Sequence, residues 1–415
     1  MTKRTSPPRI DLTEGGDWST WTLTGPQIDT LRAFDKLLDL RPSGRASDGR
    51  QRFRLKAKRT IGAARLGLGD GVVQLRIAPK VPVDRLLYLL TYTPDRADWK
   101  SEQIDAAIRP ELFPAIAIGF VRTAEQALVP GLLTGYRHRE ATSMTLRGRL
   151  RVSSQLRTRP GLALPLEIAY TEHTPDVSEN QLLLGAIRRL CRLPGLTPPI
   201  LSRLRRLDAA LEDITAPAPG APIPVWTPTR LNRRYVPALR LAEIVLRGAS
   251  FEYTDGRPIR VDGLLINMEK VFEEFLAKAL GALLERQLGG RAKPQSRNHF
   301  LDDKRQLRLK PDLVHWLPNL TGTPCPAIVV DAKYQHGLER ANLYQMLAYC
   351  TRLGLTEGHL VSVAGTAGDP TYIPTASGPI VLHHHVLDLS LSRQALTIRL
   401  SDLAQAIIQA RQTPL

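Results

Sequence analysis

Alternation of apolar and polar residues dominates the first part of the chain, to about residue 95. This period is typical of half-buried β-strands, and it predicts a β-rich region. Two such runs, FRLKAKRTIGAARLGLG and VVQLRIAPKV, flank Asp70-Gly71, a dipeptide that suits the left-handed backbone of a tight hairpin turn. The glycines Gly67, Gly69 and Gly71 also suit a phosphate-binding loop. A strand pattern rather than a helix follows them, which favours the hairpin.

Helical spacing replaces this alternation further along the chain. It predicts helices over 83–92 and from Leu112 onward, and two amphipathic helices with Arg-rich outer sides over 179–193 and 200–214. The segment TAPAPGAPIPVWTPT at 215–229 is rich in proline, which lacks the N–H that a helix or central strand needs. We therefore expect a linker there.

Between these helices, residues 132–155 read as strand, turn and strand. The segment is basic and contains Arg137, His138, Arg139, Arg147, Arg149 and Arg151. A ribbon of this kind suits contact with DNA or with a protein partner. A solvated basic face explains the pattern equally well.

The last part of the chain predicts a compact unit with a mixed sheet. Its periods indicate a helix over about 264–288, strands near 298–303, 307–316 and 326–334, a helix over 338–353 and a strand over 358–365, before further strands and a terminal helix. The fold class is therefore α+β or mixed α/β. We expect a β-rich N-terminal domain over 1–160, a helical middle region with the Pro-rich linker over 161–225, and a C-terminal domain over 226–415.

The charge of the chain points to a polyanionic partner. Lys and Arg number 57 against 40 Asp and Glu, a net charge of +17. Such an excess is typical of nucleic-acid binding, although a compositional bias towards Arg gives the same number. The three cysteines form no CxxC pair, and no apolar run has the length of a membrane span or a signal peptide. These features predict a soluble, cytoplasmic protein without membrane contact.

Two carboxylates and a lysine in the C-terminal part suggest metal-dependent chemistry. The apolar strand PAIVVDAKY ends in Asp331 and Lys333, which strand alternation places on one face. If the strand that carries Asp312 pairs with it, the three side chains meet. Two carboxylates, with the Ala332 carbonyl as a further ligand, suit Mg²⁺. A lysine beside the ion can orient water or stabilise developing charge, as phosphodiester hydrolysis requires.

The pattern Asp-x-Lys alone is weak, because it usually marks a surface ion pair. The neighbouring helices strengthen it. Gln345 and Tyr349 lie one turn apart and can hold the site or contact DNA, although a helix that packs Tyr344, Leu347 and Cys350 inward explains much of that face. Glu273, one turn after Glu269, is a candidate third carboxylate, and a solvated helical flank is the alternative.

Two other groups of residues are further candidate sites. His383, His384 and His385 occupy an apolar strand, where alternation divides them between two faces. One or two could bind a metal, but ordinary strand histidines are the commoner case. The five tryptophans form no array with basic residues, so a stacking platform for single strands is not indicated.

With these motifs in view, the chain resembles a known family. DLVHW, IVVDAKY and YQMLAY are similar to the PD-(D/E)xK nuclease superfamily, and specifically to McrC, the nuclease subunit of McrBC 5-methylcytosine restriction systems. The likeness extends to LRIAPKVPVDRLLYLLTY, LRGRLRVSSQL, TPDVSENQLLLGAI and INMEKVFEEFLAKAL, in the family's order. It implies a restriction-endonuclease-like C-terminal domain with a catalytic site at Asp312, Asp331 and Lys333.

The resemblance also implies a partner. McrC subunits act with McrB, a GTP-hydrolysing AAA+ hexamer that they stimulate through their N-terminal part. Consistently, the chain has no Gly-rich NTPase loop, so we expect it to bind no nucleotide. Double-stranded, methylated DNA is the expected substrate, read mainly by the partner. The sequence leaves open the recognised base, the site spacing, the oligomeric state and the motor-contacting residues.

Two other functions compete with a restriction nuclease. One is a non-catalytic DNA-binding or adaptor subunit with a vestigial nuclease fold, which the intact Asp312, Asp331 and Lys333 disfavour. The other is a stand-alone DNA repair nuclease, suggested by the Gln345–Tyr349 pair, which resembles that of exonuclease-type members. A neighbouring gene for a GTPase-type AAA+ motor would separate the first function from the last.

Overall fold

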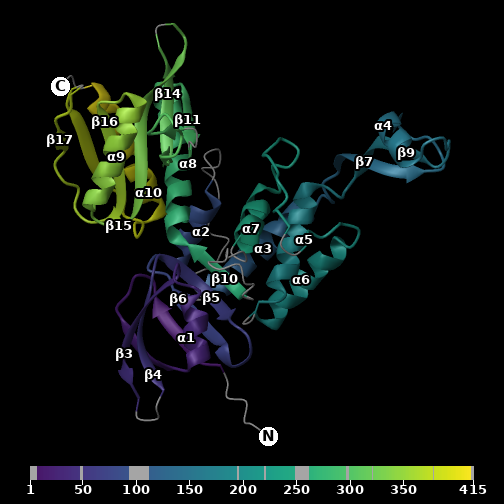
Figure 1. The fold of residues 1–415 in the computed structure, drawn as a ribbon, viewed down its shortest axis with the longest axis horizontal. Helices are drawn as coiled ribbons and strands as arrows, with labels where there is room; N and C mark the ends of the chain where they lie inside the picture. Colours follow the sequence, from purple (N-terminus) through teal and green to yellow (C-terminus); the bar gives the residue numbers. More distant parts are fainter. Residues whose placement is uncertain are drawn as a thin grey trace. The chain divides into compact units, whose positions relative to one another are not determined.

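The computed structural model describes residues 7–46, 50–92, 112–193, 196–218, 221–247, 261–295, 299–319, 321–376 and 378–412. These residues form two compact units, labelled along the chain in Figure 1. The first unit draws on the ranges 1–112, 253–261 and 265–415, and the second on 113–252 and 262–264. The architecture is mixed α/β, with several separate sheets, as the sequence predicts.

Two sheets form the N-terminal part of the first unit. The first has the order β1-β6-β5-β10, with β1 and β6 parallel, and the second has the antiparallel order β2-β4-β3. The elements are β1 (Arg9–Thr13), β2 (Ser19–Leu23), α1 (Gly25–Arg32), β3 (Leu38–Arg45), β4 (Gln51–Ala57), β5 (Thr60–Leu66), β6 (Val73–Ala78), α2 (Val83–Thr91) and β10 (Val261–Asn267). The predicted helix over 83–92 is confirmed by α2.

The predicted hairpin is present, because β5 and β6 pair antiparallel. Its turn differs from the expected one: a short 3-10 turn over Gly69–Gly71 joins the strands, and the left-handed residues are Gly67 and Gly69. Gly71 is required for another reason. A Cβ atom there would lie 2.9 Å from the hydroxyl of Thr30, so the loop closes against α1.

A six-stranded mixed sheet forms the C-terminal part of the first unit, in the order β11-β14-β15-β16-β18-β17. The central pairs β15–β16 and β16–β18 are parallel, and the outer pairs are antiparallel. The elements are α8 (Met268–Leu288), β11 (Arg291–Pro294), β12 (His299–Phe300), β13 (Arg308–Leu309), β14 (Leu313–Pro318), β15 (Pro324–His336), α9 (Arg340–Leu353), β16 (Glu357–Ala364), β17 (Thr371–Ile373), β18 (Ile380–Val386) and α10 (Arg393–Gln412).

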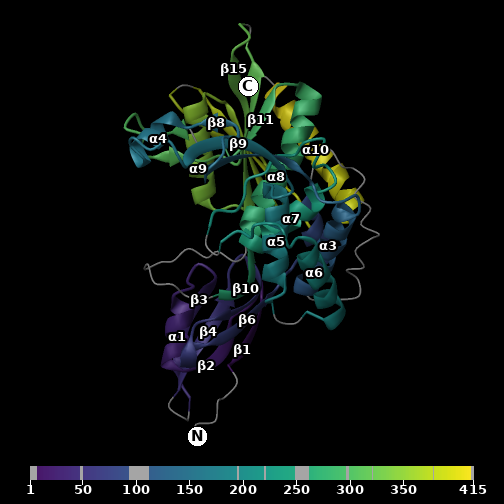
Figure 2. The ribbon, with the colours of Figure 1, turned by 90° about the vertical axis from the view of Figure 1, so that its right-hand side faces the viewer.

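Helices cover both faces of this sheet (Figure 2). On one face, Met346, Tyr349 and Cys350 of α9 join Val329 and Leu360 in a buried cluster. On the other face lie α8 and α10. Burial on both faces explains why the centre of β15, residues 327–330, is a continuous apolar run in the sequence.

The expected helix over 264–288 begins later than the sequence suggested. Residues 264–267 belong to β10, and α8 starts at Met268, where the Asn267 side chain accepts a hydrogen bond from the backbone N–H of Lys270 at 3.1 Å. Asparagine is a favoured N-cap because its side chain satisfies such an unpaired donor. The apolar run LLI concealed this boundary, since a short apolar segment suits a strand and a helix equally.

The second unit combines helices with a projecting three-stranded sheet (Figure 1). Its elements are α3 (Leu112–Leu128), β7 (Gly135–Ser143), β8 (Arg149–Leu150), α4 (Val152–Thr158), β9 (Leu166–Thr174), α5 (Ser178–Leu190), α6 (Pro198–Ala210) and α7 (Val236–Arg247). The helices predicted from Leu112 and over 179–193 and 200–214 are confirmed. The predicted strand–turn–strand is corrected, because β7 and β8 pair with β9 rather than with each other.

The helical middle region expected over 161–225 also contains strand β9. The described residues between 215 and 229 form neither helix nor strand, as expected of a linker. The compact units group 113–160 with the helices that follow, whereas the three-domain division at 160 and 225 stays a prediction. Among the described residues, no helix is long and apolar enough to cross a membrane.

Candidate active site

Asp331 and Lys333 lie near the C-terminal end of β15, on the face that α9 covers. Strand alternation directs both side chains to that face, and Lys333 Nζ lies 2.6 Å from Asp331 Oδ2. The Asp331 side chain is only 3% exposed, and apart from this ion pair its Oδ2 has no hydrogen-bond partner. The predicted shared face is confirmed.

Asp312 immediately precedes β14 and does not lie within the strand as expected, but β14 pairs antiparallel with β15 through Leu313 and Val330 as predicted. This pairing brings Asp312 beside the end of β15, where its Oδ2 accepts a hydrogen bond from the backbone N–H of Ala332 at 2.8 Å. The N–H and C=O of one strand residue point to the same side of the strand. The Ala332 carbonyl therefore also faces the Asp312 side.

Helix α9 supplies the polar contacts of Lys333. Lys333 Nζ donates to Gln345 Oε1 at 2.8 Å, and Gln345 Nε2 donates to the Tyr349 hydroxyl at 2.7 Å. Gln345 is exposed and Tyr349 is buried, so the middle of this chain of bonds faces solvent and one end lies in the core. The alternative in which Tyr344 packs inward is wrong, because Tyr344 is 71% exposed.

Glu273 approaches the same region from α8. Burial, followed by the charges of Glu269 and Asp331, raises the pKa of Glu273 to about 7. The neighbouring charges show that Glu273 lies within electrostatic reach of Asp331. Its role as a metal ligand stays a prediction.

The electrostatics of this site favour the binding of a cation. Burial raises the pKa of Asp312, and the charges of Asp331 and Glu273 raise it further. Burial likewise raises the pKa of Asp331, although Lys333 opposes the shift. Two buried carboxylates that repel one another are stabilised by a cation between them.

The available ligands fit a hard divalent ion such as Mg²⁺. Carboxylate oxygens of Asp312 and Asp331 and the carbonyl of Ala332 are the ligand types that this ion prefers, and it usually keeps several waters. In the part of the chain that the structure describes, no group of three His, Cys, Asp or Glu side chains is arranged to hold a metal. An ion here would accordingly depend on backbone and water oxygens as well as two carboxylates.

The three strand histidines form internal contacts. His359 Nδ1 lies 3.2 Å from His385 Nε2, the rings of His359 and His383 stack at 4.9 Å, and His384 Nε2 lies 2.9 Å from Ser362 Oγ. The expected division between two faces is confirmed. Burial lowers the pKa of His385 to about 4 and that of His359 well below its ordinary value. These contacts are typical of neutral core histidines.

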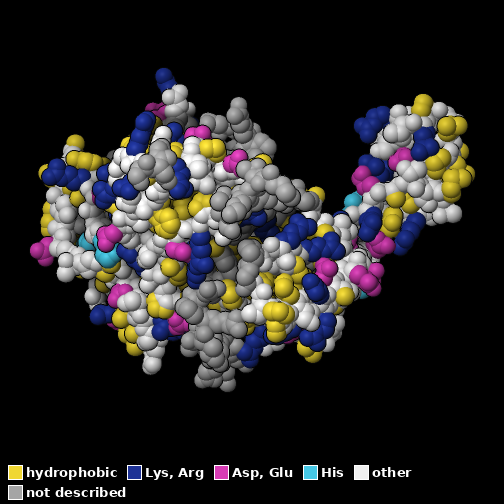
Figure 3. Space-filling model, turned by 90° about the horizontal axis from the view of Figure 1, so that it is seen from below, with side chains coloured by type: hydrophobic (Ala, Val, Ile, Leu, Met, Phe, Trp, Pro, Cys, Tyr) yellow, Lys and Arg dark blue, Asp and Glu magenta, His cyan; other side chains and the backbone are white. Residues whose placement is uncertain are grey.

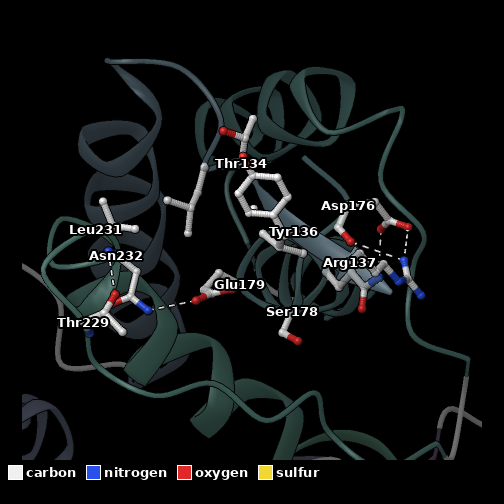
Figure 4. Close-up of a pocket in the computed structure, with 13 residues that line it drawn as sticks. Thr134, Tyr136, Arg137, Asp176, Ser178, Glu179, Thr229, Leu231 and Asn232 are labelled. Carbon is white, nitrogen blue, oxygen red and sulfur yellow. Dashed lines mark hydrogen bonds and ion pairs between the residues drawn. The ribbon is translucent and has the colours of Figure 1, made fainter. Parts of the chain in front are cut away.

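A separate pocket of about 400 Å³ lies in the second unit, at the base of the β7–β9 sheet (Figure 4). Its acidic groups are satisfied internally. Asp176 accepts hydrogen bonds from Arg137, Gln181 and Thr215, and Glu179 accepts one from Asn232 at 2.8 Å. This network ties the projecting sheet to the start of α5.

A group of polar residues beside the site was not predicted from the sequence. Arg59 donates hydrogen bonds to Glu269 and to Gln335, and Gln335 in turn donates to Asn342. Gln335 could have been found, because it continues the alternation of Asp331 and Lys333. Arg59 could not, since 276 residues separate it from Gln335 and no local pattern links them.

Comparison with known proteins identifies the family of this chain. A model of the family described as "McrBC 5-methylcytosine restriction system component" matches residues 55–362. No curated protein matches the chain. A chain in the refined half-complex of Thermococcus gammatolerans McrB AAA+ hexamers with bound McrC is similar, with a TM-score of 0.51 and 19% identity over 96% of this chain and 100% of that chain.

A chain in the cryo-EM structure of the Thermococcus gammatolerans McrBC complex is also similar, with 20% identity and a TM-score of 0.37 over 66% of this chain and 88% of that chain. The first structural match supports a common fold over nearly the whole chain. The family match covers more than half of the chain and includes Asp312, Asp331 and Lys333. This protein therefore belongs to the family of McrBC 5-methylcytosine restriction system components.

Proposed function

We propose that this chain is the Mg²⁺-dependent endonuclease subunit of a McrBC-type restriction system and cleaves double-stranded, methylated DNA. The observation that carries the proposal is the meeting of Asp312, Asp331 and Lys333 at the end of a buried strand pair. Metal-assisted phosphodiester hydrolysis needs oxygen ligands that hold the ion, and an ammonium group beside them can stabilise the developing charge. The C-terminal domain then has a PD-(D/E)xK site, with Asp312, Asp331, the Ala332 carbonyl and Glu273 as its metal-ligand candidates.

Each residue has a distinct task in this proposal. A bound divalent ion would polarise the scissile phosphate and offset charge on the leaving oxygen. Asp312 and Asp331 hold the ion, and Asp331 also orients Lys333. Lys333 can align a water molecule for attack or stabilise the charge that develops on the phosphate.

Gln345 and Tyr349 keep Lys333 in place. The Lys333–Gln345–Tyr349 chain of hydrogen bonds restricts a side chain that otherwise has several rotatable bonds. Such restriction matters because an ångström of displacement at a reacting group can cost about 100-fold in rate. The exposed position of Gln345 also allows contact with the DNA backbone.

We assign GTP hydrolysis to a hexameric AAA+ partner related to McrB, which is bound to McrC in the Thermococcus gammatolerans assembly.

The β7–β9–β8 sheet supports a protein contact better than a DNA contact. Its basic residues are largely paired, as in Arg139–Glu172 and Arg151–Glu140, both at 2.9 Å. Apolar side chains gather at its outer end (Figure 3). The exposed apolar residues of this segment are Met144, Leu146, Val152, Leu156, Leu162 and Leu164.

Reconstitution with the AAA+ partner, GTP and Mg²⁺ tests the proposal on methylated and unmethylated DNA. We expect cleavage of methylated DNA by the wild-type chain and a loss of at least about 100-fold in the Asp331→Ala variant, because a metal ligand and the partner of Lys333 are removed together. Binding to the partner and stimulation of its GTP hydrolysis should persist in the variant.

Asp402→Ala is the matched control, because Asp402 lies exposed on α10 in the same domain. It should cut like the wild type. Cleavage by Asp331→Ala at the wild-type rate would show that the site is misassigned. Absence of cleavage by the wild-type complex on either DNA would favour an adaptor role.

A further inference from the structure

Arg59 occupies the short connection between β4 and β5, in the N-terminal part of the first unit, and contacts two elements of the candidate active site. Its guanidinium donates to Glu269 Oε1 at 2.6 Å and to Gln335 Oε1 at 2.9 Å. Its backbone carbonyl accepts a hydrogen bond from the N–H of Met268 at 2.9 Å. One residue of the N-terminal sheets therefore holds the first turn of α8 and the end of β15.

These contacts lead directly to the candidate site. Glu269 lies one helical turn before Glu273 on α8. Gln335 follows Lys333 by two residues, and its Nε2 donates to Asn342 Oδ1 at 2.7 Å, in the first turn of the helix that carries Gln345. Arg59 is thus connected to all three elements, α8, β15 and α9, that surround Lys333.

The end of β15, which Arg59 contacts, has few backbone hydrogen bonds of its own. The β15–β16 ladder pairs Lys333 with Ser362 and is irregular between Lys333 and His336. Side-chain contacts replace the missing pairs. Tyr334 lies beside the buried carboxyl of Glu14, whose Oε2 accepts the N–H of Lys80 at 3.2 Å. Successive strand residues point to opposite faces, so Tyr334 and Gln335 tie this segment to the N-terminal sheets from two sides.

The Arg59–Glu269 pair contributes little to stability by itself. The two side chains are 42% and 35% exposed, and ion pairs of this kind contribute about 0–1 kcal/mol. The pair affects position more than stability. A planar guanidinium that donates to two acceptors fixes the directions of both acceptor side chains.

We propose that Arg59 is a positioning residue that holds the end of β15 and the start of α8, and so couples the N-terminal sheets to the geometry around Lys333. The inference rests on the proposed nuclease function. It means that a contact made on the N-terminal sheets, such as one with the AAA+ partner, reaches the site through Arg59 and Gln335.

The test compares Arg59→Ala, Arg59→Lys and Gln335→Ala with Arg65→Ala, a matched control at an exposed position of β5. In the reconstituted complex, Arg59→Ala and Gln335→Ala should each lower kcat for DNA cleavage by about 10- to 100-fold with KM for DNA unchanged. The double variant should lose no more than the stronger single one. Arg59→Lys, which keeps the charge and one contact, should recover part of kcat.

Melting temperature, partner binding and GTPase stimulation should stay at wild-type values in all four single variants, because the exposed contacts contribute little to folding. A wild-type kcat in Arg59→Ala, or an equal loss in Arg65→Ala, would overturn the inference. A loss of folding in Arg59→Ala with full activity in Arg59→Lys and Gln335→Ala would overturn it as well.

Hydrogen exchange of the full chain separates this inference from the nuclease proposal. Amides of residues 333–342 should exchange faster in Arg59→Ala than in the wild type or Arg65→Ala, whether or not the complex cuts DNA. Unchanged exchange there contradicts the coupling. Absence of wild-type cleavage contradicts the proposed function alone.

Discussion

At the scale of single residues, the candidate site brings negatively charged carboxylates close together in a buried region. Burial raises the pKa of both Asp312 and Asp331; the charges of Asp331 and Glu273 raise that of Asp312 further, whereas Lys333 opposes the shift at Asp331. A carboxyl group whose pKa is higher in the folded than in the unfolded chain stabilises the fold only at low pH. That contribution disappears as the pH rises through the folded-state pKa. At neutral pH and without a cation, these aspartates therefore destabilise the fold.

The variant Asp312→Asn tests this cost. The amide removes one charge and can still accept the hydrogen bond from Ala332. Without divalent metal at pH 7.5, we expect the melting temperature to rise by about 2–4 °C. Cleavage should be lost.

Mg²⁺ should raise the melting temperature of the wild type but not of Asp312→Asn, because binding to the folded state alone adds about 2.7 kcal/mol at 100 times Kd. Calorimetry with EDTA or Mg²⁺ measures both effects. Asp402→Asn is the control and should behave like the wild type. An equal response to Mg²⁺ in wild type and Asp312→Asn would argue against a metal at Asp312.

At the scale of elements, the packing of α9 on β16 determines where Gln345 and Tyr349 lie. A Cβ atom on Gly358 would come within 2.6 Å of Met346 Cγ and 2.7 Å of Cys350 Sγ. Glycine at this point of β16 therefore allows the helix to approach the sheet closely. Gly354, in the left-handed conformation at φ 68°, ends the same helix.

Gly358→Ala should move α9 away from the sheet and lower the free energy of unfolding by about 1–3 kcal/mol. Because α9 carries the two residues that hold Lys333, cleavage should fall together with stability. Urea denaturation and cleavage assays measure the two effects. Gly368→Ala, at a position where a Cβ meets nothing within 4 Å, should change neither quantity. A stable Gly358→Ala variant with full activity would show that the helix position does not matter for the site.

At the scale of the whole molecule, buried histidines connect stability to pH. His359, His383 and His385 all have a lowered pKa, chiefly because burial disfavours the charged ring. In the unfolded chain they protonate near pH 6.5. Below about pH 6.5 the unfolded chain consequently binds protons that the folded chain does not, down to about pH 4 for His385, and stability falls as the pH falls.

We expect the free energy of unfolding to decrease by up to about 1.4 kcal/mol per pH unit for each such histidine in this window. Denaturation at pH 7, 6 and 5 measures the slope. His385→Gln should flatten it, whereas His336→Gln, at an exposed position of the same domain, should leave it unchanged. A slope unaffected by His385→Gln would mean that other groups dominate acid unfolding.

Local pattern determined much of this protein. Alternation and helical spacing predicted β5 and β6, α2, α5, α6 and the strand that carries Asp331 and Lys333, because apolar period follows from which side of an element is buried. The same alternation placed the two side chains on one face, and short separation along the chain allowed Asp312 to be assigned to the neighbouring strand.

Tertiary structure decided the rest. The start of α8 at Met268 depends on β10 joining the N-terminal sheet, and the pairing of β7 and β8 with β9 depends on a strand that follows both. The link from Arg59 to Gln335 spans 276 residues. The local sequence indicates which side of each element is buried, but not which elements pack against it. Contacts between distant segments form only when the chain folds around a common core.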